Sequence, residues 1–429
     1  MRERTGRTVS AEKPVMSVVG EPFSEGEGVR RKRVIFVIGT RPEAIKMAPI
    51  IKAMECHRAT IDSIVVSTGQ HREMLDQVLR IFKITPSHDL NLMRQNQSLC
   101  ELTNRTVEAM EQLLGSIRPD LLIVQGDTST TFAASLAAFY CRVPVAHVEA
   151  GLRSFDKGNP FPEEMNRRLT TTLADYHFAP TSLAMRNLLK EGVAGDRIYV
   201  TGNTIVDALA MMTAEGSPIP EWALDGLDRP GTRMILVTAH RRENWGAPLE
   251  NICRALAHLV ERYKDVVMVF PVHLNPNVQK TVYRLLSGTP RVHLIEPLDY
   301  VSFLGAMKRA SLILTDSGGV QEEAPSLGKP VLVLRKTTER PEASESGMAR
   351  IIGTDVNDII ARVAELLDDA ALRVRMSQGE NPYGDGRASS RIVSTLLDLL
   401  KAVPHEPVES PDAGQPTKFS HHTPVAMRS

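Results

Sequence analysis

The stretch LILTDSGGVQEEAPSLGKP, residues 312–330, predicts a buried strand, a Ser-Gly-Gly turn and the start of a helix. Such a turn can cradle phosphate, because the first N–H groups of the helix, at Ser317, Gly318 and Gly319, have no intrahelical partners. Glu323 follows one turn later on the same helix face, where a carboxylate is poorly placed for phosphate but can accept both hydroxyls of a ribose. The stretch therefore predicts a site for a nucleoside diphosphate.

The rest of the chain alternates short apolar runs with segments of helical period, which is typical of a parallel sheet with crossover helices. A first series of predicted strands covers 33–38, 62–67, 121–125, 143–148, 177–179 and 198–201. A second series covers 234–239, 266–270, 292–295, 312–315 and 330–334. The predicted fold class is α/β, with two doubly wound Rossmann-like domains that face each other across a cleft.

The domain boundaries follow from these two series. The Gly- and Pro-rich segment 216–232 predicts the junction between the domains. The helical pattern at 391–403 predicts a C-terminal helix that packs back across the domains. The expected organisation is therefore a disordered extension at 1–32, domains at 33–215 and 216–380, a helical segment at 381–403 and a disordered tail at 404–429.

The composition argues against several classes of partner. The chain has 51 Lys plus Arg and 51 Asp plus Glu, so no net charge draws it to nucleic acid or to an anionic membrane. Its apolar runs are far shorter than the roughly 20 residues that span a bilayer. The four cysteines are scattered, which argues against a disulfide framework and a cysteine-rich zinc site, and indicates a cytoplasmic location.

Cofactor motifs are also missing, and candidate ligand contacts lie at strand ends instead. Neither G-x-G-x-x-G after the first strand nor G-x-x-x-x-G-K-[ST] is present, so no nicotinamide or Walker-type site is predicted. After the first strand, Arg41 and Lys46 lie near the start of a helix. Cations there oppose the helix dipole, which favours an anion between them over the alternative of two solvated side chains beside a cap.

Acidic residues follow two consecutive strands of the first series. Asp127 comes after the strand 121–125, and Glu149 comes after the strand 143–148. Consecutive parallel strands are usually neighbours, so we expect both carboxylates at one mouth of the sheet. Close carboxylates have pKa values that are pushed apart, which suits acid and base roles. The alternatives are a helix cap at Asp127 and a structural ion pair with Arg153.

Further polar residues stand in a loop and at strand ends of the second series. Glu163 and Glu164 follow a Pro-flanked loop that is long enough to fold over the same mouth, and helix capping is the alternative role. His240 lies beside two Arg, where a phosphate contact and a structural role are both consistent with the sequence. His273 and Arg340 follow later strands of the series.

These residues lie in motifs that resemble those of the non-hydrolysing UDP-N-acetylglucosamine 2-epimerases. The resemblance covers about residues 33–400. The motifs occur in family order as GTRPEAIKMAPII, TGQHREMLDQVL, QGDTSTT, HVEAGLRS, PFPEEMNRRL, TGNTIVDAL, TAHRREN, PVHLNPNV, LTDSGGVQEEAPSLGKPVLVLR, TTERPEA and NPYGDG.

The resemblance implies a glycosyltransferase-B-like fold, a homodimer, and interconversion of UDP-GlcNAc and UDP-ManNAc for envelope or exopolysaccharide synthesis, without a metal or other cofactor. The implied UDP-sugar contacts are Arg41, Lys46, Asp127, Glu149, His240, Phe303, Ser317, Gly318, Gly319, Glu323 and Arg340. The implied catalytic set is Asp127, Glu149, Glu163 and His240.

Some bacterial members hold a second, allosteric UDP-GlcNAc, and the implied positions here are Gln70, His71, Glu73, Arg241 and His273. This chain has Glu73 where some members carry Gln. It also has Leu298 where some relatives carry Gln in the uracil region, so contacts to the base would have to come from the main chain.

The chemistry constrains the mechanism of such a reaction. The hydrogen on C2 of the sugar is not next to a carbonyl, so direct proton abstraction is unreasonable at neutral pH. We therefore expect elimination of UDP to 2-acetamidoglucal, followed by re-addition. The alternatives are a glycosyltransferase of the same architecture, a hydrolysing epimerase that releases ManNAc, and a UDP-sugar sensor without chemistry.

Overall fold

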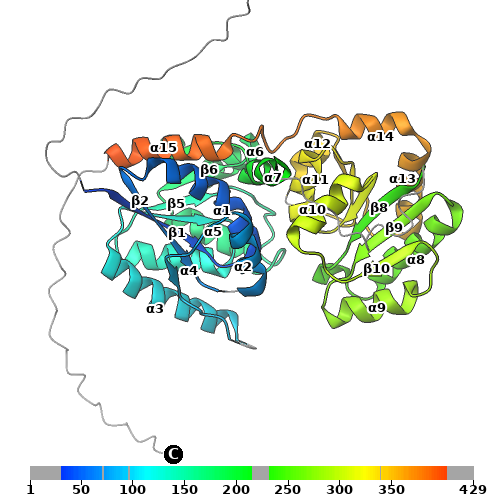
Figure 1. Cartoon of the computed structure of the whole chain (residues 1–429), viewed down its shortest axis with the longest axis horizontal. Helices are drawn as coiled ribbons and strands as arrows, with labels where there is room; N and C mark the ends of the chain where they lie inside the picture. Colours follow the sequence, from blue (N-terminus) through cyan, green and yellow to red (C-terminus); the bar gives the residue numbers. More distant parts are fainter. Residues whose placement is uncertain (1–29, 70–71, 95–96, 215–230, 339, 403–429) are drawn as a thin grey trace, which may run out of the picture.

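The computed structural model describes residues 30–69, 72–94, 97–214, 231–338 and 340–402. These residues form two lobes that lie side by side, each built around a parallel sheet (Figure 1). The predicted α/β fold class with two doubly wound units is confirmed. Among the described helices, none combines the length and the apolar character that crossing a membrane requires.

The first lobe contains a seven-stranded parallel sheet. Its strands are β1 (Lys32–Ile38), β2 (Ile61–Ser67), β3 (His88–Asp89), β4 (Leu121–Gln125), β5 (Val145–Val148), β6 (Tyr176–Ala179) and β7 (Ile198–Val200). Its helices are α1 (Arg41–Met54), α2 (Arg72–Ile81), α3 (Leu99–Ile117), α4 (Ser129–Tyr140), α5 (Glu163–Leu173), α6 (Ser182–Lys190) and α7 (Thr204–Ala214), with short 3₁₀ helices η1 (Glu55–His57) and η2 (Gly195–Arg197). The strand order is β3-β2-β1-β4-β5-β6-β7.

The second lobe contains a six-stranded parallel sheet. Its strands are β8 (Arg233–Thr238), β9 (Val266–Pro271), β10 (Val292–Ile295), β11 (Leu312–Thr315), β12 (Val331–Val333) and β13 (Ala349–Ile351). The helices that follow in the chain are η4 (Arg242–Asn244), α8 (Ala247–Arg262), α9 (Pro276–Leu286), α10 (Tyr300–Arg309), α11 (Gly318–Ser326), α12 (Pro341–Glu345), α13 (Val356–Asp368), α14 (Ala370–Ser377) and α15 (Ala388–Ala402). The strand order is β10-β9-β8-β11-β12-β13.

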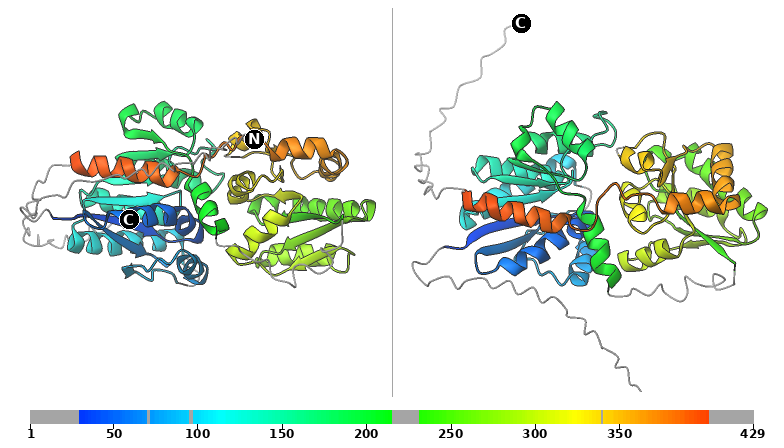
Figure 2. Two further views of the ribbon diagram at one scale, coloured as in Figure 1. Left: turned by 45° about the horizontal axis from the view of Figure 1, so that its top comes forward. Right: turned by 90° about the horizontal axis from the view of Figure 1, so that it is seen from above.

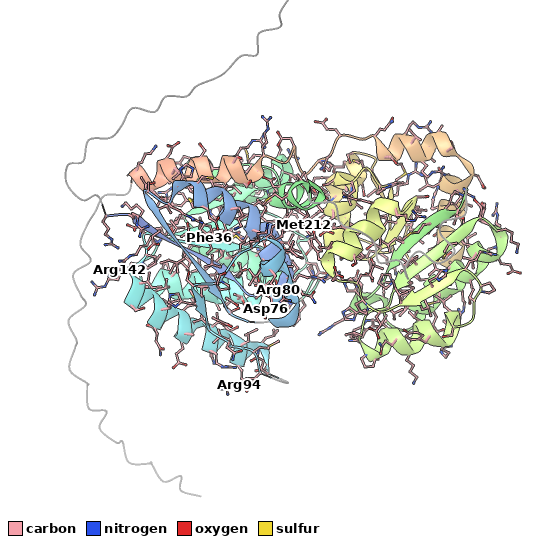
Figure 3. The ribbon with its side chains drawn as sticks, viewed as in Figure 1. Phe36, Asp76, Arg80, Arg94, Arg142 and Met212 are labelled. Atoms are coloured by element: carbon pink, nitrogen blue, oxygen red, sulfur yellow. The ribbon has the colours of Figure 1, made fainter. Side chains whose placement is uncertain are left out.

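The strands read as continuous apolar runs because helices cover both faces of each sheet. In β1, Phe36 packs in a core cluster with α1, α7 and α15, whereas the neighbouring Ile35 packs on the other face with α3 and α4. Figure 3 shows Phe36 inside the first lobe, while Arg94 and Arg142 lie at its edge. The cluster around Phe36 continues into the second lobe, where α7 meets α11.

Two strands, β3 and β13, were not predicted. β3 pairs with β2 over only two residue positions, and β13 pairs with β12 over three. Both lie at sheet edges, where a strand is held by pairing with one neighbour and needs no long apolar run. The two residues of β3 are too few for a periodic pattern, and in β13 Arg350 interrupts the apolar run.

The C-terminal end of the chain returns from the second lobe to the first. Figure 2 shows α14 on the second lobe and α15 along the first, where α15 packs against α1 and α7. The helix begins at Ala388, three residues before the predicted pattern at 391–403. The buried carboxylate of Asp207, in α7, explains the difference: it accepts hydrogen bonds from the N–H groups of Ala388 at 3.1 Å and Ser389 at 2.9 Å. A cap that comes from a distant helix is invisible in the local sequence.

Two buried histidines occupy paired positions on β5 and β6. His147 and His177 lie opposite each other in the register of the two strands. His147 donates from Nε2 to the carbonyl oxygen of Gly126 at 2.7 Å, at the turn that leads to Asp127. Burial lowers the pKa of His147 to about 3 and the pKa of His177 to about 4. Both rings are therefore neutral in the folded protein near pH 7.

Asp207→Asn should destabilise the protein, because the amide replaces one charged acceptor of the α15 N–H groups with a donor. We expect the free energy of unfolding to fall by about 1–3 kcal/mol in chemical denaturation. Asp398→Asn is the matched control: Asp398 lies on α15, is 73% exposed and pairs with Lys401. An equal effect of the two variants would contradict the capping role of Asp207.

The histidine pair should make stability depend on pH. The unfolded state binds a proton at His147 once the pH falls below about 6.5, but the folded state does so only near pH 3, so stability is lost as the solution is acidified. For His147 alone we expect a loss of about 2 kcal/mol between pH 7 and pH 5. His147→Asn should weaken this dependence in denaturation curves, whereas a change at the exposed His258 should not. The same pH dependence in His147→Asn and wild type would refute the assignment.

Candidate active site

The strand order of each sheet reverses at a point where candidate residues gather. In the first sheet, β1 lies between β2 and β4, so the loops that carry Arg41 and Asp127 leave neighbouring strands in opposite directions. In the second sheet, β8 lies between β9 and β11, so the loops that carry His240 and Ser317 also leave neighbouring strands in opposite directions. Open parallel sheets bind ligands at such switch points.

Glu43 holds together the two loops at the switch point of the first sheet. Its carboxylate accepts hydrogen bonds from the N–H groups of Gly39 at 2.8 Å and Thr40 at 2.5 Å. It also accepts from the hydroxyls of Thr128 at 2.6 Å and Thr131 at 3.0 Å. Burial raises the pKa of Glu43, and these donors partly offset the rise. The sequence spacing T-x-x-E, from Thr40 to Glu43, could have revealed this residue.

Asp127 lies in the loop after β4, with its side chain 23% exposed. Its carboxylate forms an ion pair with Arg167 of α5, and its carbonyl oxygen accepts from Asn166 at 3.0 Å. The ion pair with Arg153 that we weighed as an alternative is wrong. Arg153 instead forms an ion pair with Glu191 at 2.6 Å. The partner of Asp127 could not be read from the sequence, because Arg167 lies 40 residues away.

Glu149 follows β5 in an uncommon backbone conformation. Its φ angle is 64°, in the left-handed region that costs a residue with a Cβ roughly 1–2 kcal/mol. The turn directs the carboxylate to Lys46, with which it forms an ion pair, and to the amide groups of Gln125 at 3.1 Å and Asn203 at 3.4 Å. Burial raises the pKa of Glu149, although Lys46 opposes the rise. Such outliers are common at functional sites.

The ammonium of Lys46 links the two lobes. Besides Glu149, it contacts Glu322 of α11, with 2.7 Å between Lys46 Nζ and Glu322 Oε2. The other oxygen of Glu322 accepts from Arg340 Nε at 2.5 Å. Lys46 and Arg340 were expected to meet a diphosphate and Glu322 had no predicted role, yet in the structure Glu322 is a partner of both. A signal was present, because Glu322 is one of two consecutive carboxylates one turn beyond the predicted phosphate-binding turn.

Glu163 and its neighbour Glu164 have different environments. Glu163 is the first residue of α5, half-buried, and burial followed by the charge of Asp127 raises its pKa. Glu164 is fully buried and accepts from the N–H groups of Ser154 at 3.0 Å and Phe155 at 3.2 Å. Glu163 is therefore close enough to Asp127 to feel its charge, whereas Glu164 fixes the loop before α5 by accepting its backbone N–H groups.

His240 lies after β8 on a loop that Asp316 shapes. The fully buried Asp316 accepts from the backbone N–H groups of His240 at 2.8 Å and Arg241 at 2.9 Å, and its Oδ1 lies 3.3 Å from His240 Nδ1. The ring of His273 stacks on His240 with 5.4 Å between centroids. Burial lowers the pKa of His240, and Asp316 opposes this effect. Asp316, which directly follows β11, was not among the predicted site residues.

The turn before α11 has the predicted shape. Ser317 is the N-cap residue, and its side chain makes no capping hydrogen bond, so it leaves the first N–H groups of the helix to other acceptors. Glu323 lies on the Gly319 face of α11, since a Cβ on Gly319 would lie 3.8 Å from Glu323 Oε1. Tyr300 of α10 donates to Glu323 at 3.2 Å. Burial and the charge of Glu322 raise the pKa of Glu323 to about 7.

The remaining predicted residues are placed as follows. Arg41 is close enough for its charge to lower the pKa values of both His240 and Glu323. Phe303 lies on α10, partly buried against the core. Of the implied allosteric positions, Arg241 and His273 lie beside His240, whereas Gln70, His71 and the side chain of Glu73 lie outside the described part of the chain.

A cavity of about 460 Å³ lies between the lobes next to this site. Residues of the loop after β5 and of α6 line one side, and the other side is lined by Arg335, Thr337, Thr338, Pro341, Glu342 and Glu345. Across it, Thr181 donates a hydrogen bond to Glu342 at 2.7 Å. The lining excludes Asp127, Glu149, Glu163 and His240, so we do not assign this cavity to the reacting group.

The comparisons with known proteins agree on one family. A family model with the description UDP-N-acetylglucosamine 2-epimerase matches residues 54–397. The UDP-N-acetylglucosamine 2-epimerases of Bacillus subtilis and Escherichia coli K12 are each 51% identical to this chain, over 370 residues (86% of this chain, 96% of the relative) and 369 residues (85% and 98%). The crystal structure of the Neisseria meningitidis enzyme bound to UDP-GlcNAc matches with a TM-score of 0.81 at 48% identity, and covers 85% of this chain and all of that one. The chain therefore belongs to the UDP-N-acetylglucosamine 2-epimerase family.

Proposed function

We propose that this enzyme interconverts UDP-GlcNAc and UDP-ManNAc by inverting C2 of the sugar. The observation that carries the proposal is that the uncapped start of α11, at Ser317, and the buried acidic groups of the first lobe belong to one site. The contact of Lys46 with Glu322 of α11 connects the two. The first feature suits a diphosphate and the second suits proton transfer. The Neisseria relative bound to UDP-GlcNAc supports the choice of substrate.

The diphosphate is proposed to bind at the start of α11. The N–H groups of Gly318 and Gly319 and the hydroxyl of Ser317 would donate to its oxygens, whereas the N–H group of Ser317 already donates to Thr315 Oγ1 at 2.9 Å. Arg41 and His240 would face the diphosphate from the other loops. The charges of Lys46 and Arg340 are already balanced by carboxylates, so we expect both to contact the ligand as members of that network rather than as free cations. Phe303 would pack near the base.

The ribose is proposed to bind Glu323. A pKa raised to about 7 means that this carboxyl is protonated in part of the molecules at neutral pH. The ionised form accepts from both ribose hydroxyls, while Tyr300 holds one of its oxygens in place.

The chemical step is proposed to be elimination and re-addition of UDP. The C1–O bond breaks with its electron pair moving to the diphosphate, a carboxylate takes the C2 proton, and a C1=C2 double bond forms in 2-acetamidoglucal. UDP then adds back to C1 while a second carboxyl delivers a proton to the opposite face of C2. Burial raises the pKa values of Glu149 and Glu163, which favours their use in proton transfer, and Asp127 is the third member of the proposed acid/base group.

The resemblance also supports a homodimer, a cytoplasmic enzyme, a role in supplying ManNAc for polysaccharide synthesis, and a second UDP-GlcNAc beside the first. The stacking of His273 on His240 offers a path by which such a second nucleotide would act on the first site. Light scattering coupled to gel filtration tests the homodimer, and a sigmoidal dependence of rate on UDP-GlcNAc concentration tests the second site.

The function is tested by a proton NMR time course of the purified protein with UDP-GlcNAc in D₂O. We expect UDP-ManNAc that carries deuterium at C2, because the proton removed from C2 exchanges with solvent before re-addition. Accumulation of free ManNAc would indicate a hydrolysing enzyme. Tight UDP-sugar binding with unchanged substrate would indicate a sensor or a transferase that lacks its acceptor, and would refute the proposal.

Asp127→Asn should retain UDP binding but lose most turnover, because the variant keeps the shape of the side chain and removes its capacity for proton transfer. We expect kcat to fall by about 10²–10⁴-fold in the same NMR assay. Asp196→Asn, at an exposed position of η2, is the control and should be fully active. Full activity of Asp127→Asn would remove Asp127 from the catalytic set.

A further inference from the structure

Four charged side chains form one chain of contacts between the lobes. Glu149 and Lys46 come from the first lobe, and Glu322 and Arg340 come from the second. The distance from Lys46 Nζ to Glu322 Oε2 is 2.7 Å, and the distance from Arg340 Nε to Glu322 Oε1 is 2.5 Å. Each of the four side chains is less than a tenth exposed. The contacts therefore persist without much screening by water.

Glu322 has a distinct place in this chain of contacts. Each of its oxygens faces a different cation, and its pKa is lowered by Arg340 and Lys46 in spite of burial, so it remains ionised. The sum of the four charges is zero. Removal of the Glu322 charge would take away the carboxylate that lies between two buried cations.

The charge of Glu322 also acts on Glu149. The groups that face Glu149 are Lys46 of α1, Glu322 of α11 and Arg340 before α12, together with the amides of Gln125 and Asn203. The two cations lower the pKa of Glu149, whereas Glu322 raises it. Glu322 thus partly offsets the effect of the two cations on the pKa of Glu149.

We propose that Glu322 is a positioning residue of the epimerisation site, which holds Lys46 between the lobes and adjusts the protonation of Glu149 without contacting the sugar. The inference rests on the proposed function, because it gives Glu149 a role in proton transfer. It adds Glu322 to the machinery of the site, although the predicted set included only its neighbour Glu323.

The test is Glu322→Gln, which keeps the size of the side chain and removes its charge. We expect kcat to fall at least about tenfold, and the limb of the kcat–pH profile that reports Glu149 to move to lower pH, because the raising charge is gone. The affinity for UDP, measured by calorimetry, should stay within about threefold of wild type. Wild-type epimerisation, measured first in the same assay, separates a failure of the proposed function from a failure of this inference.

Two further variants make the result specific. Glu250→Gln is the matched control, since Glu250 contacts two Arg on the second lobe, far from this network, and it should leave both kcat and the pH profile unchanged. Glu322→Asp keeps the charge on a shorter side chain, so we expect a lower kcat with the wild-type pH profile. This variant carries the test if Glu322→Gln does not fold.

Two results would overturn the proposal. One is a Glu322→Gln enzyme with reduced thermal stability but an unchanged pH profile of kcat, which would make Glu322 a structural residue only. The other is a shift confined to the pH dependence of UDP binding. Since Glu322 also raises the pKa of Glu323, such a shift would assign its effect to the nucleotide site instead of Glu149.

Discussion

A buried chain of alternating charges between the lobes constrains the rest of the site. Lys46 of the first lobe contacts Glu322 of the second as well as Glu149, and these carboxylates compensate for the removal of its ammonium from water. This contact sets α1 beside α11, and the apolar contact of α7 with α11 supports the same arrangement. The switch points of the two sheets consequently lie close together, and the charge of Arg41 lowers the pKa values of His240 and Glu323 across the lobes.

In each lobe, a buried carboxylate shapes the loop at the switch point by accepting its backbone N–H groups. Glu43 in the first lobe and Asp316 in the second are buried carboxylates that accept backbone N–H groups of the loops after β1 and β8. A carboxylate that gathers several donors satisfies amides which would otherwise be buried without partners. Arg41 and His240 are presented by these loops, so the positions of the proposed ligand contacts depend on side chains that need not touch the ligand.

Sequence patterns revealed a large part of this arrangement. The apolar runs predicted the parallel sheets because strands covered on both faces have to be apolar throughout. The carboxylates at strand ends were visible for a related reason: Asp127 and Glu149 stand where a buried run stops, and the helix turn at Ser317 has its own local signature. Residues with partners far along the chain were not visible. Glu322 received no role, Arg153 was given the wrong partner, and the early start of α15 depends on Asp207.

The sequence by itself determined the class of fold, the residues at the strand ends and the resemblance to an epimerase family, because each of these is written in local spacing and residue type. Only the tertiary structure decided which charges meet. The pairing of Lys46 with both Glu149 and Glu322 depends on how the two lobes pack against each other, and the pKa values of Glu149 and Glu323 depend on their burial in the assembled fold. Burial and long-range charge contacts are properties of the assembled fold, and no local pattern contains them.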